Sequence, residues 1–234
     1  RGSRRVELQE PLFVLGIPRS GTTFLHRHLA LDRQRYTAFS TWEAVLAPSV
    51  TERRCLRAAA ALDRACGRPL RRLTDGLLRR LAGSLDEIHA VDLAAPEEDY
   101  LAMLPAGSCF ILLLAFPFSR ELRALGHLST LSPTERQSLL RFYRSLLQRH
   151  LYCHPGKKLL SKNAAFATWG AELKATFPQA RFLVCLREPA TALSSQLSSL
   201  AGARQLSGSD PDGSLTRDLF TDLYAAGYRD LAAF

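Results

Sequence analysis

Blocks of apolar and polar positions predict that strands and helices alternate along this 234-residue chain. The apolar run Leu12–Gly16 predicts a buried strand, and the glycine-framed turn after it leads into a helix expected over residues 21–31. Two more short apolar runs, 158–162 and 181–186, predict buried parallel strands with a helix around 168–176 crossing between them. This order is typical of βαβ units and indicates an α/β fold.

Start and stop signals define the remaining elements. Ser-Pro-Thr-Glu at 132–135 is a capping box with proline at the first helical position, and the apolar stripe after it predicts a long helix. A proline and three acids at 96–99 suit a helical first turn. We also expect a short strand over 36–39, a mobile loop over 202–214, and a final helix from Leu215.

Arginine is concentrated in one part of the chain. Nine arginines and three acids lie between residues 52 and 80, and they supply most of the formal net charge of +9. Leucines recur there at helical spacing, and Gly67 with Pro69 divides the stretch, which predicts a helical hairpin inserted over about 51–82. A solvated arginine-rich face is favoured over a dedicated anion-binding surface. We expect no nucleic-acid binding, because no helix-turn-helix, zinc or base-stacking signature accompanies the charge.

Composition limits the domain count and the compartment. At 234 residues and 47% hydrophobic, the chain can bury one substantial core, so we expect a single α/β domain over 1–234. Five widely spaced cysteines without a C-x-x-C indicate neither a disulfide framework nor a zinc site, and a cytoplasmic location is expected. The longest apolar run, 109–118, is too short to span a membrane, and no signal peptide is visible. Because the chain starts at Arg1 without methionine, a missing upstream segment could carry targeting information.

The turn after the first strand has the spacing of a phosphate-binding loop. Gly16 and Gly21 match the glycines of G-x-x-x-x-G-K-[ST], whose backbone N–H groups and helix N-terminus converge on phosphate oxygens. Thr22 stands where that loop has its lysine, and Arg19 is the only cation inside the turn. This displacement argues against ordinary ATP chemistry.

The strand at 158–162 ends in a cation. A magnesium-dependent P-loop enzyme usually ends a neighbouring strand in aspartate, and here Lys162 stands at that edge. A fixed cation can stabilise developing negative charge as a metal would. We therefore expect no metal requirement.

Two motifs resemble those of sulfotransferases that use 3′-phosphoadenosine 5′-phosphosulfate (PAPS). The first is Pro-Arg-Ser-Gly-Thr-Thr at 18–23 followed by an aromatic residue. The second is the segment 177–189, in which the strand expected over 181–186 ends, with Ser195 eight residues after Arg187. Arg187 at a strand end and Ser195 about two helical turns later could reach one dianion. The resemblance implies a P-loop NTPase-like three-layer sandwich with a central parallel sheet. It also implies that the 3′-phosphate contacts Arg187 and Ser195, and that the rest of PAPS contacts the loop residues Arg19, Ser20, Gly21, Thr22, Thr23 and Phe24.

The closest resemblance is to the bacterial-type family, through Thr-Trp-Glu at 41–43, Pro-Glu-Glu-Asp at 96–99 and the lysine at the strand end. It implies that Lys162 approaches the sulfuryl group and the leaving phosphate. Glu43 is the first candidate for the general base and His89 the second, since cytosolic sulfotransferases use histidine. Asn163 departs from the family pattern beside Lys162, as Glu188 does beside Arg187. Such enzymes usually continue beyond this length, so we expect a fragment incomplete at its C-terminus.

The resulting hypothesis is in-line transfer of a sulfuryl group from PAPS to a hydroxyl or amine of a small-molecule, glycan or peptide acceptor. Glu43 or His89 takes the proton, while Arg19 and Lys162 stabilise charge on the leaving phosphate. Two alternatives remain, a P-loop kinase for a small molecule, which would need ATP and magnesium, and a catalytically degenerate nucleotide-binding interaction protein. The sequence identifies neither the acceptor nor the oligomeric state.

Overall fold

The central layer of the molecule is a parallel sheet. In the computed structural model, which describes residues 2–70, 72–73, 93–208 and 210–234, four strands lie in the order β2-β3-β1-β4. Their bounds are β1 Leu12–Gly16, β2 Tyr36–Thr37, β3 Lys158–Lys162 and β4 Arg181–Cys185. All their pairings are parallel. The expected α/β fold with a central parallel sheet is confirmed.

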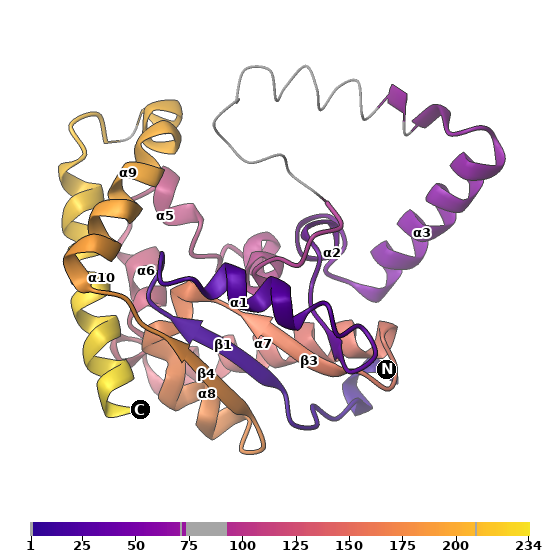
Figure 1. Cartoon of the computed structure of the whole chain (residues 1–234), viewed down its shortest axis with the longest axis horizontal. Coiled ribbons are helices and arrows are strands. Elements are labelled where there is room, and N and C mark those ends of the chain that lie inside the picture. The colour runs from indigo at the N-terminus through magenta and orange to yellow at the C-terminus, as the bar shows by residue number, and fades with distance from the viewer. Residues whose placement is uncertain (1, 71, 74–92, 209) are drawn as a thin grey trace.

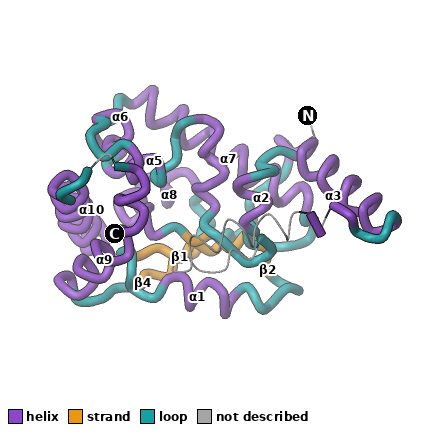
Figure 2. Tube along the Cα trace, turned by 90° about the horizontal axis from the view of Figure 1, so that it is seen from above, coloured by secondary structure: helices purple, strands orange, loops and turns teal. Residues whose placement is uncertain are grey.

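Helices cover both faces of this sheet (Figure 1). The helices are α1 Thr22–Leu29, α2 Thr41–Val45, α3 Val50–Ala65, α5 Leu112–Ala115, α6 Arg120–Arg123, α7 Pro133–Cys153, α8 Gly170–Thr176, α9 Pro189–Ser207 and α10 Ser214–Ala233. Short 3₁₀ helices are η1 Gly2–Arg5, η2 Asp99–Ala106, η3 Ala124–Gly126, η4 Leu128–Thr130 and η5 Ala164–Trp169. Seen from above, α1 lies on one side of the strands and α7 and α8 on the other (Figure 2).

The side chains of β1 explain this layering. Successive residues of a strand point to opposite faces. Leu12 and Val14 pack in the cluster that includes residues of α1, whereas Phe13 and Leu15 join the larger cluster with α7 and α8. All five residues of β1 are buried, so the strand lies at the centre of three layers.

Several predicted elements differ in extent from the observed ones. β2 has two residues, and the chain after it forms a single bridge from Ser40 to Pro96. β4 is largely exposed rather than buried, because it is an edge strand of the described sheet. Helix α9 continues to Ser207, so the loop expected over 202–214 is shorter. In the region of the helical insertion expected over about 51–82, the structure has α3, and most of the second half of that region lies outside the described residues.

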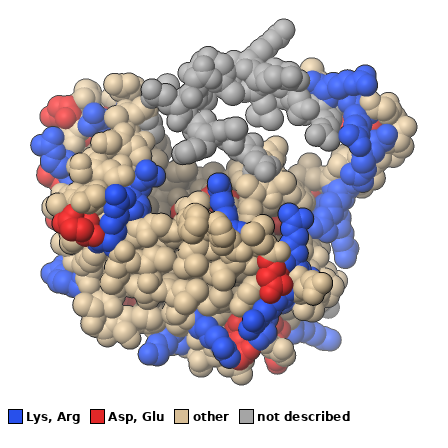
Figure 3. All heavy atoms as spheres, in the orientation of Figure 1, with Lys and Arg blue, Asp and Glu red and all other residues tan. Residues whose placement is uncertain are grey.

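Basic side chains follow α3 on the surface (Figure 3). Arg54, Arg57 and Arg64 are exposed there, as a solvated arginine-rich face requires. Arg53 is the exception, because it is 1% exposed and points into the molecule. None of the helices in the described residues has the length and hydrophobicity of a membrane span.

Candidate functional site

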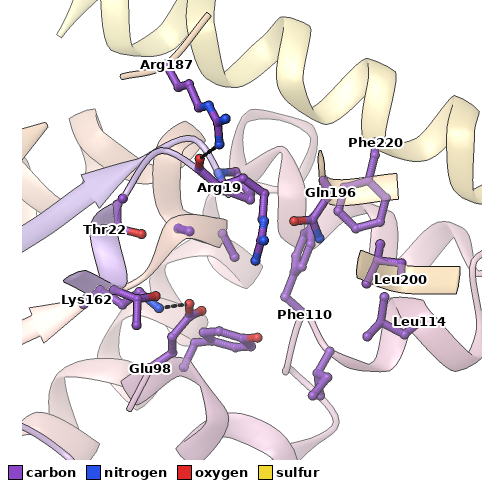
Figure 4. A pocket seen from close by; sticks show the side chains of 17 residues that line it. Arg19, Thr22, Glu98, Phe110, Leu114, Lys162, Arg187, Gln196, Leu200 and Phe220 are labelled. Atoms are coloured by element: carbon purple, nitrogen blue, oxygen red, sulfur yellow. Dashed lines mark hydrogen bonds and ion pairs between the residues drawn. The ribbon is translucent and has the colours of Figure 1, made fainter. Parts of the chain in front are cut away.

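The register of the sheet brings the predicted phosphate-binding residues to one edge. Val14 pairs with Lys162, and Gly16 pairs with Cys185. Because the carboxyl ends of parallel strands meet at the same edge, the loop after β1, the end of β3 and the segment after β4 converge there. A pocket of about 530 Å³ lies at this edge, and Arg19, Lys162 and Arg187 all line it (Figure 4).

Gly16 is required where β1 meets β4. A Cβ on this residue would lie 2.4 Å from the carbonyl oxygen of Cys185, closer than any real contact. The loop then turns through Arg19, which has φ of 68°, a left-handed conformation that is costly for a residue with a side chain. Gly21 also has a positive φ, of 90°, immediately before α1 begins. The loop therefore has the unusual backbone that the glycine spacing predicts.

Elements near the C-terminus hold the loop in this conformation. Arg187 donates from Nη1 to the carbonyl oxygen of Arg19 at 3.0 Å, and the Nε of Arg19 donates to Oγ of Ser195 at 3.0 Å. The Tyr224 hydroxyl on α10 donates to the carbonyl of Pro18 at 2.9 Å, and the Tyr228 hydroxyl donates to the carbonyl of Arg187. The sequence reasoning missed both tyrosines, although their i, i+4 spacing puts them on one helix face.

The loop has unused hydrogen-bonding capacity. The Oγ of Ser20 is buried and has no hydrogen-bond partner among the described residues. The first N–H groups of α1, which begins at Thr22, have no acceptor inside the helix, as in any α-helix. An anion between these groups would satisfy donors that the fold leaves free. The residues present therefore fit a phosphate or phosphosulfate group.

Glu98 is the acidic residue that lines this pocket within the described chain, and it forms an ion pair with Lys162. Lys162 is 5% exposed at the end of β3. Burial raises the pKa of Glu98, and the charge of Lys162 opposes that shift only in part. The sequence analysis included Glu98 in a motif but gave it no role. The available signal was the run of three consecutive acids at 97–99, in a chain whose strand 158–162 ends in a lysine.

A buried polar cluster behind the pair joins the two chain segments. The Asn163 side chain donates to Asp99 and accepts from the backbone N–H of Tyr100 at 3.1 Å. The Tyr143 hydroxyl donates to Asp99 at 3.0 Å and lies 3.2 Å from Oγ of Ser161. Burial raises the pKa of Asp99 to about 6. Asn163, a departure from the expected pattern, thus fixes the Glu98 segment against the end of β3.

Glu43 lies elsewhere. It is 3% exposed, is not among the residues lining the pocket, and accepts hydrogen bonds from Ser40 and from Nε2 of His154 at 2.9 Å. Arg53 lies 3.3 Å from its carboxylate, and His150 is also adjacent. Burial alone would raise the pKa of Glu43, but the His154 hydrogen bond and the neighbouring charges lower it to about 2. A carboxylate held in this way is a poor proton acceptor, so this arrangement does not favour Glu43 as the base, and its role there stays a prediction.

The other predicted site residues have different outcomes. Thr22, Thr23 and Gly21 line the pocket with Arg19, whereas Phe24 is 70% exposed on α1 and does not. Glu188, the other departure from the expected pattern, caps α9 by accepting from the backbone of Ala190 and Thr191. His89 lies outside the described residues.

The fold is a P-loop-like α/β fold, and its pocket gathers Arg19, Lys162 and Arg187 at one edge of the sheet. The family model described as the sulfotransferase family matches residues 11–234, so this chain belongs to that family. No match was found among curated proteins.

Two solved structures share the fold. Sulfotransferase STF1 from Mycobacterium tuberculosis H37Rv has 20% sequence identity and a TM-score of 0.73, and the match covers 99% of this chain and 60% of that one. Sulfotransferase STF9 from Mycobacterium avium has 22% identity and a TM-score of 0.72, with coverage of 99% and 57%. The chain therefore spans less than two thirds of the length of either structure.

Proposed function

We propose that the protein transfers a sulfuryl group from PAPS to a hydroxyl or amine of an acceptor. The observation that carries this proposal is the meeting of Arg19, Lys162 and Arg187, from three different strand ends, around one glycine-framed loop. A nucleotide with phosphates at both its 5′ and 3′ positions needs cations on both sides of the ribose. Membership of the sulfotransferase family supports the same reaction.

In this proposal the loop and the segment after β4 divide the donor between them. The N–H groups at the start of α1, with the hydroxyls of Ser20, Thr22 and Thr23, bind the 5′-phosphosulfate. Arg187 and Ser195 bind the 3′-phosphate, which requires Arg19 to leave Ser195, its present partner. Phe24, exposed one position further along α1, remains a proposed cofactor contact.

The transfer moves one group and one proton. The S–O bond to the 5′-phosphate breaks as sulfur forms a new bond to the acceptor, S–O for a hydroxyl or S–N for an amine, and adenosine 3′,5′-bisphosphate leaves. Lys162 and Arg19 stabilise the charge that develops on that phosphate. We assign the proton to Glu98, because it faces the pocket and its raised pKa makes it a better acceptor than an ordinary carboxylate.

Binding of adenosine 3′,5′-bisphosphate and adenosine 5′-phosphate, measured by calorimetry, tests the donor assignment. Ser195→Ala should weaken binding of the bisphosphate by about 1.5 to 3 kcal/mol and barely change binding of the monophosphate. Arg187→Ala should weaken binding of the bisphosphate by more than binding of the monophosphate, which it also affects because Arg187 holds the loop at the carbonyl of Arg19. Ser199→Ala is the matched control, since its hydroxyl is one turn further along α9 and donates to the backbone of Gln196. Equal losses for both nucleotides would show that this pair does not hold the 3′-phosphate.

The kinase alternative differs in its requirements. A kinase would bind ATP with magnesium and lose its activity completely and reversibly in excess EDTA. A sulfotransferase that uses Lys162 as its fixed cation should keep transferring sulfuryl groups under those conditions. Bisphosphate binding without turnover on any acceptor would instead favour the nucleotide-binding interaction protein.

A further inference from the structure

We propose that the acceptor is a hydroxyl compound with an apolar, aliphatic or aromatic body rather than a polyhydroxylated one such as a sugar. This inference rests on the proposed function and names the substrate class of the same pocket. It follows from how charge and hydrocarbon are distributed along the pocket wall.

The pocket has a charged side and an apolar side (Figure 4). Arg19, Lys162, Glu98 and Arg187 supply the charges. The side chains of the opposite wall are hydrocarbon and come from three separate segments: Phe110, Ile111, Leu114, Leu200 and Phe220. Gln196 is the polar side chain on this wall, and Tyr100 also lines the pocket, two positions after Glu98 in the chain.

The acceptor end of the pocket is set by the groups that act on the acceptor. Glu98, assigned the proton, and Lys162 lie together, so the attacking oxygen must lie beside this pair. The chain that follows Glu98 returns to the pocket at Phe110 and again at Leu114 on α5. The body of an acceptor whose hydroxyl lies at Glu98 therefore contacts this apolar wall.

Such a wall discriminates between acceptors. Hydrocarbon surface that leaves water against Phe110 and Leu114 gains free energy in proportion to its area. Ring hydroxyls placed there would lose their hydrogen bonds to water and find few partners in return. Discrimination against a polyol follows from these two effects together.

A matched pair of acceptors tests the proposal. Cyclohexylmethanol and methyl glucopyranoside both present a primary hydroxyl on a six-membered ring. With PAPS as donor, transfer to cyclohexylmethanol should be at least tenfold more efficient than transfer to the glucoside. Calorimetry on the protein saturated with adenosine 3′,5′-bisphosphate should show that cyclohexylmethanol also binds more tightly. Equal or better transfer to the glucoside, with tighter binding, would overturn the proposal.

A variant pair locates the contact. Leu114→Gln should lower the efficiency with cyclohexylmethanol about tenfold and leave bisphosphate affinity within twofold of wild type. Leu112→Gln is the control, because Leu112 is on the same helix and half-buried but does not line the pocket. If Leu114→Gln weakens bisphosphate binding instead, the wall holds the nucleotide base and the proposal is wrong.

The bisphosphate titration also separates this inference from the function on which it rests. If the wild-type protein does not bind adenosine 3′,5′-bisphosphate, the proposed function is contradicted, and the proposed class of acceptor is contradicted as well. Normal bisphosphate binding together with a preference for the glucoside contradicts the acceptor class alone.

Discussion

Glu98 and Lys162 neutralise each other inside the pocket, so a change to either alters both charge and basicity. Glu98→Gln keeps the size of the side chain and removes its basicity. Turnover should fall roughly a hundredfold to ten-thousandfold. Affinity for adenosine 3′,5′-bisphosphate should not weaken, because the substitution removes a negative charge beside Lys162. Steady-state kinetics and calorimetry on the same preparation measure the two effects.

Glu43→Gln is the contrasting substitution. It leaves the buried guanidinium of Arg53 without its charge partner, so the free energy of unfolding should fall by about 3 kcal/mol. Turnover per folded molecule should be unchanged, because Glu43 does not line the pocket. A collapse of turnover in Glu43→Gln with near-normal turnover in Glu98→Gln would return the base role to Glu43.

Asp99 gives stability a specific dependence on pH. Its pKa is raised to about 6 in the folded protein, above the ordinary value of 3.8, because burial disfavours the charged form. The folded state therefore holds a proton that the unfolded state has lost between these two values, and stability should decrease as pH rises from about 4 to 6. The decrease amounts to about 3 kcal/mol.

Asp99→Asn removes this titration. Urea denaturation of the wild type and of this variant should be measured between pH 4 and pH 7. The difference between their unfolding free energies should change from about pH 4 to pH 6 and stay constant above about pH 6. A constant difference throughout would mean that Asp99 titrates normally in the folded protein.

The surroundings of Glu43 show which contacts a sequence does not reveal. Ser40 and Glu43 form a capping box at the start of α2, a local pattern that explains a glutamate at this position without any catalysis. Its other partners, Arg53, His150 and His154, come from α3 and the end of α7. Contacts between residues so distant in the sequence depend on tertiary packing, which no local pattern encodes.

Among the elements, α10 has an effect on the phosphate loop that can be measured. Tyr224→Phe removes the hydrogen bond to the carbonyl of Pro18 and keeps the ring in its apolar cluster. The loop should hold its conformation less firmly, and bisphosphate affinity should fall by about 1 kcal/mol. Calorimetry on this variant and on Tyr152→Phe, a change at an exposed residue of α7, checks the effect; equal affinities would exclude a role for the Tyr224 hydroxyl.

The bounds of elements that have a strong local sequence pattern were predictable. The properties of elements that depend on neighbouring elements were less predictable. The strand β3 and the start of α7 have the predicted bounds, because an apolar run and a capping box are properties of the sequence itself. The exposure of β4 depends on which strand lies beside it. Helix α9 continues past Gly202, where nothing lies within 4 Å of an added Cβ, so that glycine neither ends the helix nor marks a close contact.

For the whole molecule, the exposed edge at β4 predicts self-association. Leu183, Val184 and the following Leu186 are 39%, 41% and 61% exposed, and β4 pairs with β1 on one side only within the described sheet. An apolar edge strand is a template for pairing with another chain. Val184→Lys should reduce concentration-dependent association in sedimentation velocity without changing bisphosphate affinity; unchanged association would show that this edge is not involved.

The hydrogen bonds between the phosphate loop and α9 also bear on biosynthesis. Arg19 is linked to Ser195 across 176 positions and to Arg187 across 168. A ribosome must therefore complete most of this chain before the two halves of the phosphate cradle can meet. A nascent chain that ends before Arg187 carries the loop without the groups that fix its backbone. Nucleotide capture should therefore begin only after Arg187 and Ser195 have left the ribosome and docked on the loop.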